Sequence, residues 1–139
     1  MNVLLILSLS LSFLYSEQYQ DIKISRIDSV YDGDTIFVDI DSYPDIIGKR
    51  IGIRVRRIDA PEIRTNCIRE KELAHKAKEH VIYFLKKCEN IYLRNIERGK
   101  FFRIAADVYC DEKSLSQSLI KNNLAFPYNE NSHRTRLCD

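Results

Sequence analysis

The chain has 139 residues, the length of one domain of ordinary size. Hydrophobic residues make up 45% and charged residues 30%, which excludes a wholly disordered chain, a collagen-like repeat and a protein with many membrane spans. The 22 Lys and Arg against 20 Asp and Glu leave a net charge of only +2, so a polycation that coats nucleic acid indiscriminately is excluded as well.

The N-terminal segment resembles a secretory leader. Met1–Ser16 contains no charged residue, and Val3–Tyr15 is a nearly continuous apolar run. About 13 residues are too few to span a bilayer as a helix, but they suit the apolar region of a signal peptide. We expect cleavage after Ser16 and a single domain over residues 17–139. The alternative is a buried N-terminal strand or helix, because no Lys or Arg precedes the apolar run.

Two strands are expected at the start of the domain. Residues 21–30 alternate isoleucine with polar residues, and residues 35–40 are β-branched and aromatic. Between them, Tyr31–Asp34 is a turn signal in which Gly33 can take a positive φ.

The next elements follow a break at residues 41–45. Residues 50–58 alternate apolar residues with glycine and arginine, which indicates a third strand. Residues 69–87 repeat apolar positions at steps of three and four, which indicates an amphipathic helix of about five turns. Two more strands are expected at residues 91–94 and 102–109.

A second helix is predicted from Ser114, which forms a plausible capping box with Gln117. It ends near Asn123, a residue that tolerates a left-handed C-cap, and the tail from Pro127 is expected to be irregular. Five short strands with a helix after the third indicate an α+β protein built on a small closed barrel of the OB type.

Two acidic clusters are candidates for chemistry, at residues 32–35 and 59–62. Six basic residues surround the second cluster: Lys49, Arg50, Arg54, Arg56, Arg57 and Arg64. Carboxylates suit a hard cation such as Ca²⁺, and arginine matches phosphate oxygens. If the strands pair side by side, Asp34 and Asp59 can share an ion. The alternative is a turn with solvated acids beside a solvated arginine face.

Three motifs resemble the signature of thermonucleases, the staphylococcal nuclease-like family. They are the sequences Val30–Thr35, Ile53–Glu62 and Lys100–Arg103, the last with Phe102 where the family usually has glycine. The likeness extends over residues 23–128. It implies an α+β, five-stranded OB-fold β-barrel with two to three helices and a Ca²⁺-dependent phosphodiesterase that acts on DNA and RNA.

The resemblance also implies a metal site. Asp34 and Asp59 would bind Ca²⁺ by their side chains. Ala60 would contribute its backbone carbonyl, although the family commonly has threonine there. Asp32 would shape the loop from behind these ligands.

Catalytic roles follow by the same resemblance. Glu62 would act as general base or orient the attacking water, while Arg54 and Arg103 would stabilise charge on the phosphorus oxygens. Tyr128 and Lys100 are possible substrate contacts.

The four cysteines allow three disulfide connectivities in an oxidising compartment, and four free thiols in the cytosol. If the two predicted strands after the first helix pair antiparallel, Cys88 and Cys110 fall at the same end of the hairpin. Cys67 and Cys138 would then form the second bridge.

We therefore expect a secreted or periplasmic, monomeric Ca²⁺-dependent endonuclease with a DNA or RNA substrate. No stable protein partner is implied, nor a membrane span once the leader is cleaved. The main alternative is a non-catalytic OB-fold module that binds nucleic acid or protein. A third is an exported structural protein held together by disulfides.

Overall fold

A computed structural model describes residues 19–129 and 137–138. The predicted leader, residues 1–16, and its cleavage site lie outside these residues. Within the described part of the chain, no helix is long and apolar enough to cross a membrane.

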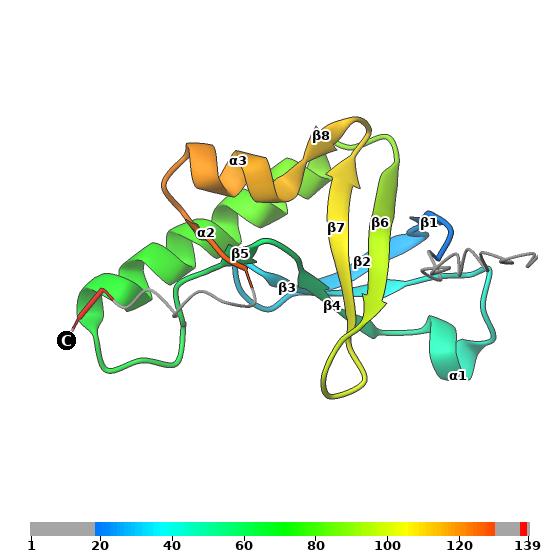
Figure 1. Ribbon diagram of the computed structural model, residues 1–139, viewed down its shortest axis with the longest axis horizontal. Coiled ribbons are helices and arrows are strands. Elements are labelled where there is room, and N and C mark those ends of the chain that lie inside the picture. The colour runs from blue at the N-terminus through cyan, green and yellow to red at the C-terminus, as the bar shows by residue number, and fades with distance from the viewer. Residues whose placement is uncertain (1–18, 130–136, 139) are drawn as a thin grey trace, which may run out of the picture.

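Strands and helices follow one another in an order close to the expected one (Figure 1). In chain order the described elements are β1 (Ile22–Lys23), β2 (Arg26–Val30), β3 (Thr35–Asp39), α1 (Asp45–Gly48), β4 (Ile51–Val55), β5 (Ile58–Asp59), α2 (Ile68–Lys86), β6 (Ile91–Arg98), β7 (Ile104–Cys110), β8 (Lys113–Ser114), α3 (Leu115–Lys121) and β9 (Phe126–Pro127).

The main sheet has the strand order β1-β6-β7-β4-β3-β2, with β8 paired to β7. Pairing is antiparallel except between β4 and β7. The first expected strand is divided, because the chain bends after β1. Ile24 N–H donates to Ile91 O at 2.9 Å and Ser25 N–H donates to Asp39 O at 2.9 Å. The segment 22–30 therefore forms hydrogen bonds with β6 near one end of the strand order and with β3 near the other, so the sheet is curled. The predicted α+β OB-fold is confirmed.

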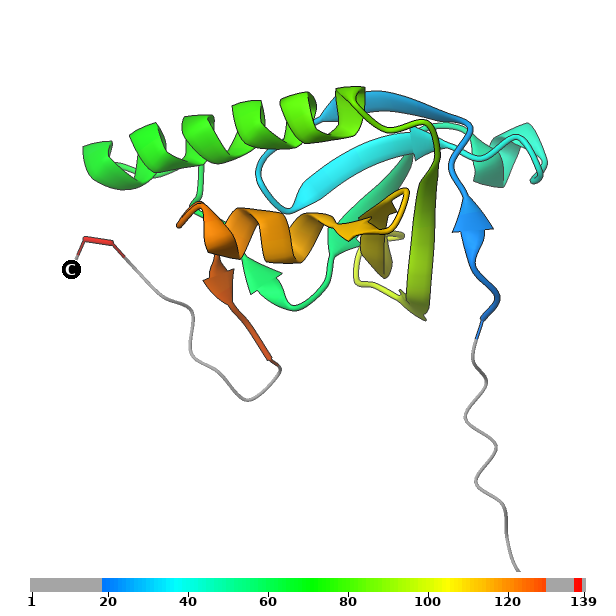
Figure 2. The same cartoon turned by 90° about the horizontal axis from the view of Figure 1, so that it is seen from above.

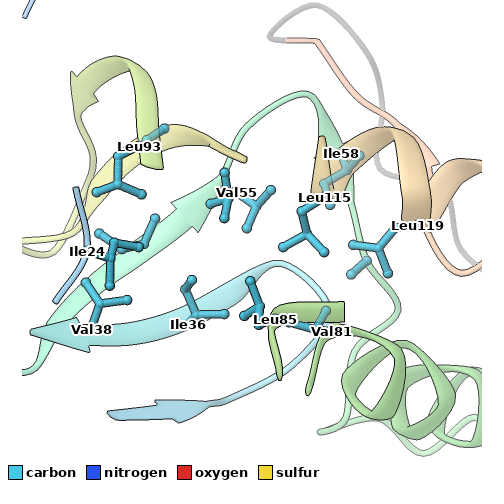
Figure 3. Packing of buried hydrophobic residues seen from close by; sticks show 14 of the residues in the cluster. Ile24, Ile36, Val38, Val55, Ile58, Val81, Leu85, Leu93, Leu115 and Leu119 are labelled. Carbon is cyan, nitrogen blue, oxygen red and sulfur yellow. The ribbon is translucent and has the colours of Figure 1, made fainter. Parts of the chain in front are cut away.

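The hydrophobic core lies between the concave side of the sheet and the helices α2 and α3 (Figures 2 and 3). Ile36 and Val38 alternate inward along β3, while Val81 on α2 and Leu119 on α3 meet them from the other side, all fully buried. Each such side chain contributes about 1.5–3 kcal/mol. His80 Nε2 and Ser118 Oγ, 2.8 Å apart, link the two helices.

Two boundaries differ from the sequence prediction in ways that matter for the site. The third strand ends at Val55 and not at residue 58, because Arg57 takes φ 66° and reverses the chain. Phe126 and Pro127, where the irregular tail was expected to begin, form β9, which pairs with β5: Asp59 lies opposite Phe126. Asp59 is thus positioned by a second, two-stranded sheet.

The caps of α3 agree with the sequence prediction. Ser114 Oγ accepts a hydrogen bond from Gln117 N–H at 3.3 Å, and Asn123 has φ 55° just after the helix.

Two disulfides join the cysteines as the hairpin argument expected. Cys88 and Cys110 are bridged with a Cα separation of 5.1 Å, and Cys67 and Cys138 with one of 5.9 Å. The second bridge ties the N-cap of α2 to the end of the chain.

Candidate active site

A cavity of about 900 Å³ opens at one end of β3 and β4. Its lining includes every residue that the sequence predicted for metal binding or catalysis: Asp32, Asp34, Arg54, Asp59, Ala60, Glu62 and Arg103. The two possible substrate contacts, Lys100 and Tyr128, are not among the lining residues. Tyr128 instead donates its backbone N–H to Arg57 O at 2.9 Å.

Antiparallel pairing of β3 with β4 brings the first acidic cluster to the arginine strand. Thr35 lies opposite Arg54, and Val55 N–H donates to Asp34 O at 2.8 Å. Asp34 therefore enters the cavity from the start of β3, beside a guanidinium from the neighbouring strand.

Gly33 is required by close packing and not by its backbone angle. Gly33 does not use the positive φ that its turn motif allows, since no glycine among the described residues has one. A Cβ at Gly33 would lie 2.8 Å from Ala60 Cβ and 3.0 Å from Ala77 Cβ. Without a side chain, the first turn packs directly on the second acidic cluster and on α2.

Asp34 is a buried carboxylate with several partners. Its Oδ2 accepts from Ala60 N–H at 2.8 Å, and its Oδ1 accepts from the Thr35 hydroxyl at 3.1 Å. Asp32 Oδ1 accepts the Asp34 N–H at 3.0 Å, so Asp32 does hold the turn. Burial raises the pKa of Asp34 from 3.8 to about 6, against the opposing effect of Arg54.

Arg54 bridges the two predicted metal-binding carboxylates. Its Nη1 lies 2.9 Å from Asp34 Oδ2 and its Nη2 lies 3.6 Å from Asp59 Oδ1. The same guanidinium donates to the carbonyls of Val55 at 3.0 Å and Ile58 at 3.1 Å. The side chain is therefore held in one orientation by the framework around it.

Glu62 lies in a loop that is tied to the first turn of α2. Its backbone N–H donates to Glu70 Oε1 at 3.1 Å, and Glu70 Oε2 accepts from the Thr65 hydroxyl at 3.1 Å. Glu70 N–H in turn donates to Cys67 Sγ at 3.3 Å. Because Cys67 is bridged to Cys138, the loop that carries Glu62 is fixed at both the helix cap and the tail.

Arg103 reaches the cavity from the β6–β7 hairpin across β4. A Cβ at Gly52 would lie 3.0 Å from Arg103 Cγ, so the glycine leaves room for the arginine stem. Arg103 Nε donates to Lys100 O at 3.4 Å. Phe102 adopts φ 58° although it stands where the family usually has glycine.

The donors at the cavity fit Ca²⁺ in chemical type. Asp34, Asp59 and the Ala60 carbonyl offer hard oxygen atoms, which this ion prefers. Within residues 19–129 and 137–138, no group of three or more His, Cys, Asp or Glu side chains could hold a metal by itself. An ion here would need backbone carbonyl and water ligands besides the two carboxylates.

Sequence reasoning missed part of the cavity wall, namely Tyr31, Thr35, Phe37, Arg64 and Phe101. Tyr31, Thr35 and Phe101 lie inside the three family-like motifs, and Arg64 was counted among the basic residues, so these four carried a usable signal. The Arg64 guanidinium lies 6.0 Å from the centre of the Tyr31 ring. Nothing in the sequence marked Phe37 as a site residue, because an aromatic residue is ordinary in a predicted strand.

Comparison with known proteins supports the same assignment. An uncharacterized 38.1 kDa protein of Capnoides sempervirens is 29% identical over 94 residues, which cover 67% of this chain and 25% of that protein. This chain therefore matches about a quarter of that relative's length. The family model described as staphylococcal nuclease homologue matches residues 52–138, from β4 to the second disulfide. Its extent and the confirmed fold show that the chain belongs to the staphylococcal nuclease homologue family.

Proposed function

We propose that the protein is a Ca²⁺-dependent endonuclease that hydrolyses phosphodiester bonds of DNA or RNA by attack of water. The observation that carries the proposal is the composition of one cavity: four acidic residues, Asp32, Asp34, Asp59 and Glu62, line it together with Arg54, Arg64 and Arg103. Membership of the family supports a nuclease-type or nucleic-acid-binding module.

In this proposal Asp34, Asp59 and the Ala60 carbonyl would hold the Ca²⁺ ion. When bound, the ion supplies positive charge that offsets the negative phosphodiester. Asp32 keeps the Asp34 turn in place through the hydrogen bond to the Asp34 N–H. The close contact at Gly33 keeps the two acidic clusters together.

Glu62 takes a proton from the attacking water or orients that water. The water oxygen forms a bond to phosphorus, and the bond to the leaving oxygen breaks. Arg54 and Arg103 bind the non-bridging oxygens, on which negative charge grows in the transition state. Arg54 is suited to this role because its orientation is already fixed by two carboxylates and two carbonyls.

The proposal includes export to an oxidising compartment. It is supported by the two disulfides, which use all four cysteines of the chain. The uncharged N-terminal run of the sequence is the second support.

The decisive experiment is incubation of the purified protein with single-stranded DNA and RNA in Ca²⁺ and in excess chelator. We expect cleavage only with Ca²⁺, and a loss of at least 10²-fold in Glu62→Gln. Glu79→Gln, an exposed change on α2, is the matched control and should cleave normally. Cleavage that persists in chelator, or normal turnover by Glu62→Gln, would contradict the mechanism.

A non-catalytic nucleic-acid-binding module is the second candidate. It is favoured by the lack of a metal-binding group of three acidic, histidine or cysteine side chains among the described residues. This candidate predicts that the protein retains an oligonucleotide in Ca²⁺ without shortening it. Gel electrophoresis of the bound strand separates the two candidates.

A further inference from the structure

The tip of the β6–β7 hairpin, residues 98–103, carries two aromatic rings that the fold does not bury. Phe101 is 85% exposed and Phe102 is fully exposed. The tip projects away from α2 and α3 (Figure 1). Exposed rings that pack on no core residue are typical of binding surfaces.

The backbone of the tip makes these rings more unusual. Phe101 has φ 57° and Phe102 has φ 58°. Two consecutive non-glycine residues in the left-handed region are strained, and such strain is concentrated at functional sites. Glycine at either position would relieve the strain, so phenylalanine at this tip needs a reason outside the fold.

The tip is also cationic. Among residues 19–129 and 137–138, the side chains of Arg98, Lys100 and Arg103 form no ion pair with a carboxylate. The neighbouring acid Glu97 is engaged, with its Oε1 2.7 Å from Arg56 Nη2. The positive charge of the tip is therefore available to an anion.

The tip lies between the candidate active site and a second, larger groove. This groove has a volume of about 1500 Å³ and is lined by β1, α1 and the hairpin. Phe101 and Arg103 line both the groove and the active-site cavity, whereas Phe102 lines the groove alone. Phe102 therefore lies on the groove side of a tip that borders both hollows.

We propose that this tip binds a single strand of nucleic acid where it leaves the active site, with Phe102 stacking on a base in the groove. Arg98 and Lys100 attract the phosphates of the same strand. Unpaired cations next to exposed aromatic rings are the chemistry that binds single strands, because every base offers a face for stacking. The bases of a duplex are already stacked on each other, so a duplex gains less binding free energy from an exposed aromatic ring. The inference rests on the proposed function and adds the substrate's strandedness to it.

Phe102→Gly is the most informative variant. It removes the ring and introduces the residue type that adopts φ 58° without strain. Its stability should not fall, so weaker binding would not reflect misfolding. Tyr83→Ala is the matched control, since Tyr83 is an aromatic residue 60% exposed on α2, outside both cavities.

The test measures binding of fluorescein-labelled oligothymidylate to the full chain in excess chelator, by fluorescence anisotropy. We expect Phe102→Gly to raise Kd on the order of 10- to 100-fold and Tyr83→Ala to leave it unchanged. A labelled duplex should respond less to Phe102→Gly than the single strand does. An unchanged Kd in Phe102→Gly, or an equal loss in both variants, would overturn the proposal.

A lipid surface is the competing partner for exposed phenylalanines flanked by cations. Flotation with phosphatidylcholine–phosphatidylglycerol vesicles tests it on the same variants. Vesicle binding lost in Phe102→Gly together with unchanged oligonucleotide binding would assign the tip to membranes and overturn the proposal. Because strand binding is measured without turnover, a protein that binds but never cleaves would refute the proposed nuclease and leave this inference standing.

Discussion

The two arginines that face the candidate phosphate site have contrasting surroundings. Arg54 comes from β4 and is held by Asp34, Asp59 and two carbonyls. Arg103 comes from an exposed hairpin tip and crosses β4 over Gly52, and among the described residues its side chain donates to one carbonyl, Lys100 O of its own turn. The two guanidinium groups thus reach the same cavity in different ways. That of Arg54 is fixed by hydrogen bonds and ion pairs, whereas that of Arg103 is carried by an exposed loop.

The largest effect is expected for Arg54→Ala. It removes a preorganised donor and also leaves Asp34 buried without its cation, so both rate and stability should fall. We expect a loss of about 10²–10³-fold in kcat and a destabilisation on the order of 3 kcal/mol. Single-turnover rates and urea denaturation measure the two. Arg69→Ala on α2 is the control. A fully stable Arg54→Ala protein would contradict the framework role.

Arg103→Ala should separate the two effects. We expect a loss of kcat of about 10²-fold with stability unchanged within about 0.5 kcal/mol, because Arg103 has no carboxylate partner among the described residues. The same two measurements apply. If Arg103→Ala unfolds as readily as Arg54→Ala, the contrast between the two arginines is wrong.

Asp34→Asn tests the cost of burying charge in the framework. The pKa of Asp34 is raised from 3.8 to about 6, so between these pH values the folded protein binds more protons than the unfolded chain. The contribution of Asp34 to stability without Ca²⁺ should therefore be greatest below about pH 4 and fall as pH rises through 6, by at most roughly 3 kcal/mol. Denaturation at pH 4 to 8 should show this fall in the wild type and not in Asp34→Asn. A parallel pH profile in both proteins would contradict it.

The smallest effect on stability is expected for Gly52→Ala, which mainly perturbs Arg103, since the other neighbour, Phe37 Cε1, would lie at an ordinary contact distance of 3.4 Å from the new Cβ. The added Cβ would meet Arg103 Cγ at 3.0 Å, and this flexible stem can shift. We expect nearly unchanged stability and a loss of kcat of up to about 10²-fold, because misplacement by about 1 Å has costs of this size. Thermal melts and initial rates measure both. Normal kcat would show that the path of Arg103 over Gly52 is unimportant.

The sequence by itself determined which residues are available for chemistry and most of the elements that carry them. The motif residues are short-range patterns, and the period of three to four residues that indicated α2 is a local consequence of burying one helix face. The capping of α3 by Ser114 could also be predicted from the sequence, because the hydrogen bond joins residues only three positions apart.

Only the tertiary structure decided how these residues meet. The pairing of Asp59 opposite Phe126 joins segments far apart in the chain, as does the close approach of Gly33 to Ala60 and Ala77. The turn motif indicated only that Gly33 can take a positive φ, whereas the space around it is set by Ala60 and Ala77 from other parts of the chain. A local sequence pattern indicates backbone preference and burial. The space available to a side chain, and the residue with which a charged group pairs, depend on chain segments outside that pattern.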